Sequence, residues 1–215
     1  MAYKGLRRML YQKELVPGQK IVCGEVAERL KMSPTPIIQA LKWLEIQGLV
    51  RHETNRGYFL EPISLKELEE IYGLRELLEP SLIPETVKRI DQDGMKRLKK
   101  ALDEHFSAVR EFYLKERLFK NMEFHLTLAS LSGNETQVRL LRHIFDLLFL
   151  KYGGNLPHGS SLDSVDNEHK EIYEGIIAGD HKGAQRVLKG HIRNVKKQVL
   201  GIFKRMLEER YVPFP

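Results

Sequence analysis

The sequence has a single cysteine, Cys23, among its 215 residues. One thiol excludes an internal disulfide framework and a zinc site built from cysteines. The chain also lacks an apolar run of about 18 residues, the length that a membrane-spanning helix requires. Its first residues, MAYKGLRRML, contain no apolar signal-peptide region. We therefore expect a soluble, cytoplasmic protein that does not enter a membrane.

An excess of acidic residues is also absent, since the net charge is +6. Residues 1–62 contain 10 Lys/Arg and 6 Asp/Glu, whereas residues 63–215 contain 25 and 23. The chain is long enough for two small domains. A basic N-terminal part is expected of a module that meets nucleic-acid phosphates, although many proteins with other functions carry a similar charge.

The most informative stretch is Ser33–Phe59, which reads SPTPIIQALKWLEIQGLVRHETNRGYF. Within it, Ile37, Leu41 and Leu44 follow the i, i+4, i+7 spacing of one apolar stripe on an α-helix. Gly48 is placed to end that helix. Two short β-prone runs, 49–53 and 58–61, follow and are joined by TNRG, a pattern that predicts a hairpin.

A helix near residues 25–30, a turn, the helix that follows and the hairpin together predict a winged helix-turn-helix. In such motifs the second helix enters the major groove of DNA. We expect Trp43, whose neighbours are apolar, to lie in the core or at a domain interface.

The N-terminal part resembles the GntR family of bacterial transcription regulators, in the FadR-like branch with an all-helical FCD ligand domain. The resemblance rests on LVPGQKI, VAERLKMSPTP, ALKWLEIQGLV and RGYFLEP, in that order and spacing. It implies a winged helix-turn-helix domain over residues 1–62, a linker over 63–66 and an FCD-like domain over 67–215. The implied partner is a double-stranded DNA operator.

The recognition helix departs from that family. The branch usually reads Ser-Arg-Thr-Pro-Val-Arg-Glu-Ala-Leu where this chain reads SPTPIIQAL, so Pro34 and Ile38 replace both arginines. Arginine is the commonest specific reader of guanine, so guanine readout from these positions is not expected. The remaining candidates for DNA contact are hydroxyl, amide and cationic side chains with one wing glycine: Ser33, Thr35, Gln39, Lys42, Arg51, Arg56 and Gly57.

From residue 64 onward the apolar residues keep a helical period. Helices are predicted near 64–90, 92–109, 114–131, 135–152, 164–178 and 181–208, as an all-α antiparallel bundle. This part resembles the FCD domain through LRELLEP, NMEFHLTLASLSGN, NEHKEIYEGIIAGD and GAQRVLKGHI.

Three histidines on three of these helices are candidate metal ligands: His125, His169 and His191. Imidazoles that converge from several helices commonly build metal sites in bundles, although an isolated core histidine is the more frequent case. The resemblance adds a fourth position, because metal-binding FCD domains carry an Asp four residues before the first histidine. Asn121 occupies that position here. The expected cofactor is a divalent transition metal, zinc or nickel.

The remaining histidines, among them His105, are expected at surface or boundary positions, and no acidic residue is expected to pair with the three ligands. Arg75 matches an arginine that lines the FCD pocket, and its fork suits a carboxylate effector. The alternative is an ordinary surface ion pair with Glu76 or Glu79. Asn134 and Tyr152 are further candidates for effector binding.

The sequence therefore favours a transcription regulator, not an enzyme, whose operator affinity responds to a small carboxylic acid bound beside the metal. A single winged helix with so few cations would bind DNA weakly, so a homodimer on a two-fold operator is expected. One alternative is a metal-dependent enzyme that uses the three histidines, which would also need a positioned base. Another is a sensor or assembly protein that has lost specific DNA binding.

Overall fold

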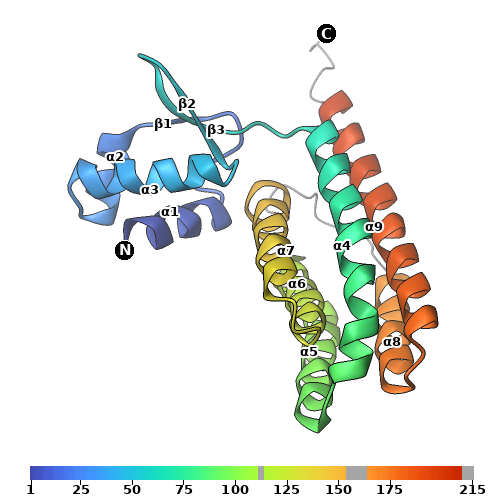
Figure 1. The fold of residues 1–215 in the computed structure, drawn as a ribbon. Helices are drawn as coiled ribbons and strands as arrows, with labels where there is room; N and C mark the ends of the chain where they lie inside the picture. The colour runs from blue at the N-terminus through green and yellow to red at the C-terminus, as the bar shows by residue number, and fades with distance from the viewer. Residues whose placement is uncertain (111–113, 154–163, 210–215) are drawn as a thin grey trace. The chain divides into compact units, whose positions relative to one another are not determined.

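The computed structural model describes residues 1–110, 114–153 and 164–209 (Figure 1). Contacts divide the chain into two units, one formed by residues 1–64 with 146–155 and the other by 65–145 with 156–215. Residues 1–64 of the first unit form three α-helices and three strands: α1 (Ala2–Tyr11), β1 (Lys20–Ile21), α2 (Cys23–Leu30), α3 (Pro34–Ile46), β2 (Val50–Glu53) and β3 (Gly57–Leu60).

The strands form an antiparallel sheet in the order β1-β3-β2. Ile21 of β1 lies opposite Tyr58, and Val50 of β2 lies opposite Leu60. The predicted hairpin is therefore the wing, and β1 is a short third strand beside it. Helices α1, α2 and α3 pack around one core, which includes the buried residues Leu6, Val26, Ile37, Leu41 and Leu44. The predicted winged helix-turn-helix is confirmed.

Helix α3 ends as its sequence predicts. Gly48 has a φ of +72°, a left-handed conformation that glycine adopts without a steric penalty. The amide of Gly48 donates to the Glu45 carbonyl at 2.9 Å, and the amide of Leu49 donates to the Leu44 carbonyl at 3.0 Å. These two hydrogen bonds form a Schellman motif, which satisfies the last carbonyls of α3 and directs the chain into β2.

Of the two positions expected for Trp43, the core position is wrong. The side chain of Trp43 is 62% exposed and is not part of the core. The buried stripe of the helix contains Ile37, Ala40, Leu41 and Leu44. Trp43 precedes Leu44 by one residue, which turns it about 100° away from that stripe.

The second unit is helical throughout its described residues. Its elements are α4 (Leu65–Arg89), α5 (Gln92–Arg110), α6 (Leu114–Ser130), α7 (Glu135–Leu147), α8 (Ser164–Ile177) and α9 (His181–Glu209). Helix α9 packs along α4 and α8, and α5 packs along α6. A five-residue π-helix, η1 (Leu148–Tyr152), continues α7 and belongs by contact to the first unit. None of the described helices is long and apolar enough to cross a membrane.

Helix α4 contains two prolines, Pro80 and Pro84, in its interior. A proline at 84 has no N–H to donate to the carbonyl of residue 80, four positions earlier. The side-chain amide of Gln185 on α9 donates to that Pro80 carbonyl at 2.9 Å. A buried carbonyl without a donor would be costly, so this contact lets α4 continue through Pro84 while packed against α9.

Candidate metal centre and nucleic-acid interface

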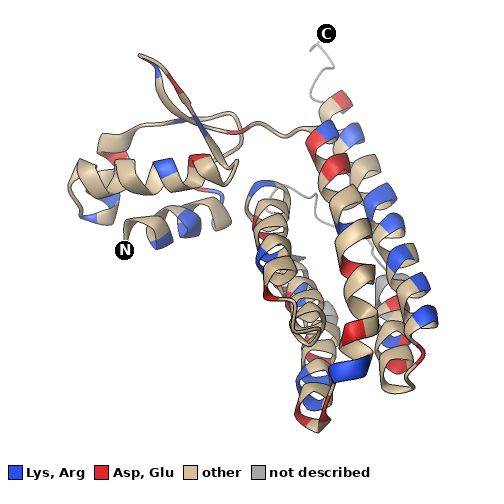
Figure 2. Ribbon diagram, viewed as in Figure 1, with Lys and Arg blue, Asp and Glu red and all other residues tan. Residues whose placement is uncertain are grey.

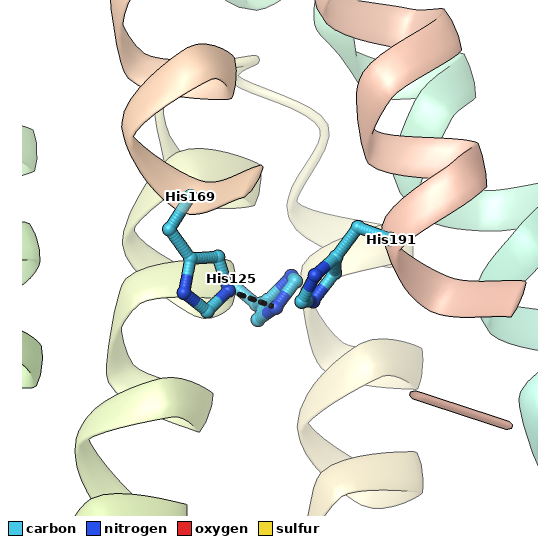
Figure 3. A group of neighbouring side chains, drawn as sticks. All are labelled: His125, His169 and His191. Carbon is cyan, nitrogen blue, oxygen red and sulfur yellow. Dashed lines mark hydrogen bonds between the residues drawn. The ribbon is translucent and has the colours of Figure 1, made fainter. Parts of the chain in front are cut away.

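Three histidines from three different helices meet in the interior of the second unit. His125 lies on α6, His169 on α8 and His191 on α9, and all three are buried. Figure 3 shows the three rings pointing toward one another. Each ring offers one nitrogen, and these three atoms lie within 4.8 Å of one another. The structure thus brings together the three histidines that the sequence nominates as ligands.

Local periodicity explains why each ring points inward. His169 precedes the buried Ile172 and Ile176 by three and seven residues, so all three share one face of α8. His191 follows the buried Leu188 by three residues on α9. These histidines therefore occupy positions on the apolar stripes that the bundle buries.

Two of the rings place Nδ1 against a carboxylate. His125 Nδ1 lies 2.6 Å from Glu79 Oε2, and His191 Nδ1 lies 2.8 Å from Glu168 Oε2. A carboxylate accepts hydrogen bonds, so in the neutral rings the proton belongs on Nδ1 and the lone pair on Nε2. Carboxylate partners of this kind orient metal-ligating imidazoles.

The distance between His125 Nε2 and His169 Nε2 is 3.2 Å. Two nitrogens that bind one tetrahedral zinc at 2.0–2.1 Å would lie about 3.3 Å apart, so this spacing fits a shared metal. It also fits a hydrogen bond in which His169 donates to His125. The donor set therefore suits a divalent transition metal, and a hydrogen-bonded cluster is the metal-free alternative.

The rings of His125 and His169 are both neutral at pH 7. Burial lowers the pKa of His125 to about 4, although Glu79 acts in the opposite direction. Burial also lowers the pKa of His169 well below its ordinary value, and neighbouring His191 adds to the effect. Metals bind the neutral form of imidazole. Because the lowered pKa values keep these rings neutral, a metal would not have to displace a proton from a charged ring in order to bind.

Glu79 connects His125 to Arg75. Arg75 Nε donates to Glu79 Oε1 at 2.6 Å, and the two side chains are only 2% and 1% exposed. Burial by itself raises the pKa of Glu79, but Arg75 and His125 together lower it to about 2, so the carboxylate is ionised. The expectation that no acidic residue pairs with the histidines is wrong, because Glu79 and Glu168 both do so.

Arg75 does form the ion pair with Glu79 that the sequence offers as an alternative, but the pair lies in the core and not on the surface. The guanidinium lies 4.6 Å from the ring centroid of Phe145 and 5.2 Å from that of Tyr72. Its Nη2 is buried and has no hydrogen-bond partner among the described residues. A buried guanidinium nitrogen in this state can donate to a bound anion.

His105 on α5 is fully buried, and its ring centroid lies 4.6 Å from that of His169. Its predicted surface or boundary position is therefore wrong. Asn121 is half-buried on α6, one turn before His125, as its spacing requires.

The other two effector candidates, Asn134 and Tyr152, each make a hydrogen bond within the chain. Asn134 is exposed and caps α7, because its Oδ1 accepts from the Gln137 amide at 3.1 Å. Tyr152 is buried within the first unit, where its hydroxyl donates to the Ser64 carbonyl at 3.1 Å.

The candidate DNA-contacting residues at the beginning of α3 and along it are accessible. Ser33, Thr35, Gln39 and Lys42 are all exposed. Ser33 occupies the N-cap position with extended backbone angles, and its hydroxyl makes no capping hydrogen bond within the described chain. That hydroxyl and the Thr35 amide are therefore available to a phosphate, whereas Pro34 and Pro36 have no N–H to donate.

The wing arginines are already engaged by one carboxylate. Arg51 Nε donates to Glu53 Oε1 at 3.0 Å, and Arg51 Nη1 donates to the Leu60 carbonyl at 3.2 Å. Arg56, which is exposed, pairs with the other oxygen of Glu53. Gly57 has a φ of +95° and begins β3 at the tip of the wing. Phosphate contact by either arginine thus competes with Glu53, which the sequence did not implicate.

Residues 1–60 match the family described as bacterial regulatory proteins, gntR family, and residues 70–194 match the FCD domain. The chain is 25% identical to the HTH-type transcriptional regulator LutR of Bacillus subtilis, over 91% of this chain and 98% of that protein. It is 22% identical to the Uxu operon transcriptional regulator of Escherichia coli, over 91% and 84%. The solved structure of E. coli McbR/YncC superposes with a TM-score of 0.80 at 18% identity, over 94% and 96% of the two chains, which shows the same fold.

Proposed function

We propose, from the premise that the chain belongs to the gntR family of bacterial transcription regulators and carries an FCD domain, that a carboxylic acid bound in its helical bundle controls its affinity for an operator. The family and the relatives are DNA-binding transcription regulators and not enzymes. The observation that carries the proposal is the buried cluster of three imidazoles with Arg75 attached to it through Glu79.

The metal part of the proposal rests on the donor set. His125, His169 and His191 would bind one divalent transition metal per chain, zinc or nickel, through nitrogens that face one another. Asn121 would act as an optional oxygen ligand one turn away on α6. A metal bound by three imidazoles supplies open coordination positions that accept a carboxylate. Glu79 and Glu168 would hold two of the rings in the ligating orientation.

The effector part rests on Arg75. Nε of this residue is used by Glu79, whereas the buried Nη2 has no partner among the described residues. A carboxylate bound beside the histidines would give that donor a charged acceptor. An acid that binds one arrangement of the bundle more tightly than another would shift the population toward it and so change operator affinity. Asn134 and Tyr152 are further candidates for effector contact, although Asn134 Oδ1 caps α7 and the Tyr152 hydroxyl donates to the Ser64 carbonyl.

The DNA part includes dimer formation. Helix α3 carries one lysine and one glutamate, and Glu53 engages both wing arginines. Affinity follows the number of phosphates that a protein neutralises, so one winged helix of this kind would bind weakly. Two copies on a two-fold operator would combine two weak events into a stronger one. We therefore propose a homodimer that binds two half-sites.

The metal is tested by elemental analysis and native mass spectrometry of the purified full-length protein. We expect one metal per chain, strong loss of metal when His125, His169 or His191 is replaced by alanine, and tighter binding in Asn121→Asp. His181→Ala is the control, because His181 is exposed and outside the cluster. Full metal content in the triple His→Ala protein would refute the metal site and favour the hydrogen-bonded cluster.

The control of DNA binding is tested by selecting genomic fragments with the purified protein and measuring operator affinity with and without EDTA and a panel of carboxylic acids. An acid that changes operator affinity should bind more weakly to Arg75→Lys, which keeps the positive charge beside Glu79 but removes the guanidinium fork. Metal content should stay unchanged in that variant. No preference for any fragment over random duplex at low salt would refute the operator-binding regulator and favour a sensor without an operator.

A further inference from the structure

The outward side of α3 is unusually apolar for a helix expected to meet DNA. Its exposed residues over the first two turns are Pro34, Thr35, Ile38 and Gln39, and the first charged side chain is Lys42. Figure 2 shows the contrast between α3, which has few charged residues, and α9, which carries many lysines and arginines. The beginning of α3 therefore offers methyl and methylene groups beside one hydroxyl and one amide, and no arginine.

Ile38 is the central residue of this side. Its side chain is 38% exposed, while the adjacent Ile37 is fully buried in the core. Pro34 lies four residues before it, on the same line along the helix. The next exposed position, Gln39, carries an amide that can donate one hydrogen bond and accept another. An apolar side chain thus lies beside a side chain suited to bidentate hydrogen bonding.

The edges of base pairs in the major groove present one apolar group, the C5-methyl of thymine. Adenine presents an acceptor and a donor there, which a glutamine can bind together. We propose that Ile38 reads a thymine methyl group next to an adenine bound by Gln39, so that each half-site is centred on A·T pairs. This inference rests on the proposed function, because it needs a sequence-specific operator.

The position of Ile38 on the helix supports a DNA base as its partner. In a helix-turn-helix, the residues near the beginning of the second helix contact the base edges. Ile38 is the fifth residue of α3, whereas Ile46 is its last residue, about 12 Å farther along the axis. Both side chains are exposed, Ile46 at 74%. Ile46 therefore serves as a control for Ile38, because it is the same residue type at the end of α3 that lies away from the base edges.

The test compares operators that contain thymine with operators that contain deoxyuridine. Uracil keeps the Watson–Crick pairing and removes only the C5-methyl group. Loss of one methyl contact should weaken binding of the full-length protein about fourfold per half-site. Substitution in both half-sites of a dimer operator should weaken it about sixteenfold. Deoxyuridine at flanking positions should have no effect, which controls for general changes in the duplex.

Two variants assign the effect to one side chain. Ile38→Ala should bind thymine and deoxyuridine operators equally, because the shortened side chain no longer reaches the methyl group. Ile46→Ala should keep the full ratio between the two operators. A change in that ratio in Ile46→Ala and not in Ile38→Ala would overturn the assignment to Ile38.

If the unmodified protein binds both operators equally at every thymine of a sequence-specific site, the reading of a methyl group is overturned. The proposed regulator function would still stand in that case. Absence of any sequence-specific duplex would overturn the proposed function and this inference together. These outcomes therefore distinguish failure of methyl reading from failure of the proposed function.

Discussion

Replacing Glu79 by glutamine should destabilise the bundle strongly, because Glu79 uses both of its oxygens. Oε1 accepts from Arg75 Nε and Oε2 lies 2.6 Å from His125 Nδ1. An amide can accept at one of these sites and presents N–H groups at the other, and it leaves the charge of Arg75 without a counterion. Breaking a buried ion pair from one side typically costs about 3–5 kcal/mol of unfolding free energy. We expect Glu79→Gln to fall in that range.

The same helix provides the control. Arg89 Nε donates to Glu85 Oε2 at 3.1 Å, also across four residues of α4. The side chains of Arg89 and Glu85 are 59% and 49% exposed, so water solvates and screens them. Exposed pairs of this kind contribute about 0–1 kcal/mol. Glu85→Gln should therefore change the free energy of unfolding by less than about 1 kcal/mol.

The assay is urea unfolding of EDTA-treated protein at pH 7, followed by far-ultraviolet circular dichroism. Fluorescence is unsuitable, because the single tryptophan, Trp43, lies on α3 in the first unit and does not report on the bundle. Metal titration adds a second measurement. Loss of the carboxylate behind His125 should weaken metal binding about 10- to 100-fold in Glu79→Gln. Equal stability and equal metal affinity in both variants would refute the linked roles of Arg75, Glu79 and His125.

Three further predictions concern pH and DNA. In metal-free protein, the folded pKa of His125, about 4, lies below its ordinary value of 6.5, so the unfolded state binds more protons between these pH values. The free energy of unfolding should fall by on the order of 3 kcal/mol as pH is lowered from 6.5 to 4, and a flat profile in urea titrations would contradict this. Glu53→Gln should free Arg51 and Arg56 for phosphates, strengthen operator binding and steepen its salt dependence, and weaker binding would show that Glu53 orders the wing. Lys42→Ala should weaken binding to all duplexes alike and reduce the salt slope by about 0.9, as measured by titration at several salt concentrations.

The local features of the fold were predictable from the sequence. The helical period from Leu65 onward, interrupted at short polar breaks, predicts bundle helices whose ends agree closely with those observed. The end of α3 at Gly48 and the wing hairpin are equally local, because turn chemistry depends on adjacent residues. The convergence of His125, His169 and His191 was also predicted, since each lies on a stripe that a bundle must bury.

Other features of the site could not be predicted in this way. The pairs Glu79–His125 and Glu168–His191 join residues 46 and 23 positions apart, so the helix period places each residue on a face without naming its partner. The burial of His105 against His169 likewise depends on how α5 packs near α8. The sequence did reveal the i, i+4 spacing of Arg75 and Glu79, but not whether that pair lies in water or in the core.

The sequence by itself determined which segments are helices and strands, the winged helix-turn-helix with its atypical recognition helix, and the three imidazoles of the bundle. It did so because propensity, capping and amphipathic period act over a few residues. Only the tertiary structure decided that Arg75 is buried behind Glu79, that Glu168 holds His191 and that Trp43 faces outward. These outcomes depend on which helix faces meet and how much water their contact excludes, and no local pattern encodes either quantity.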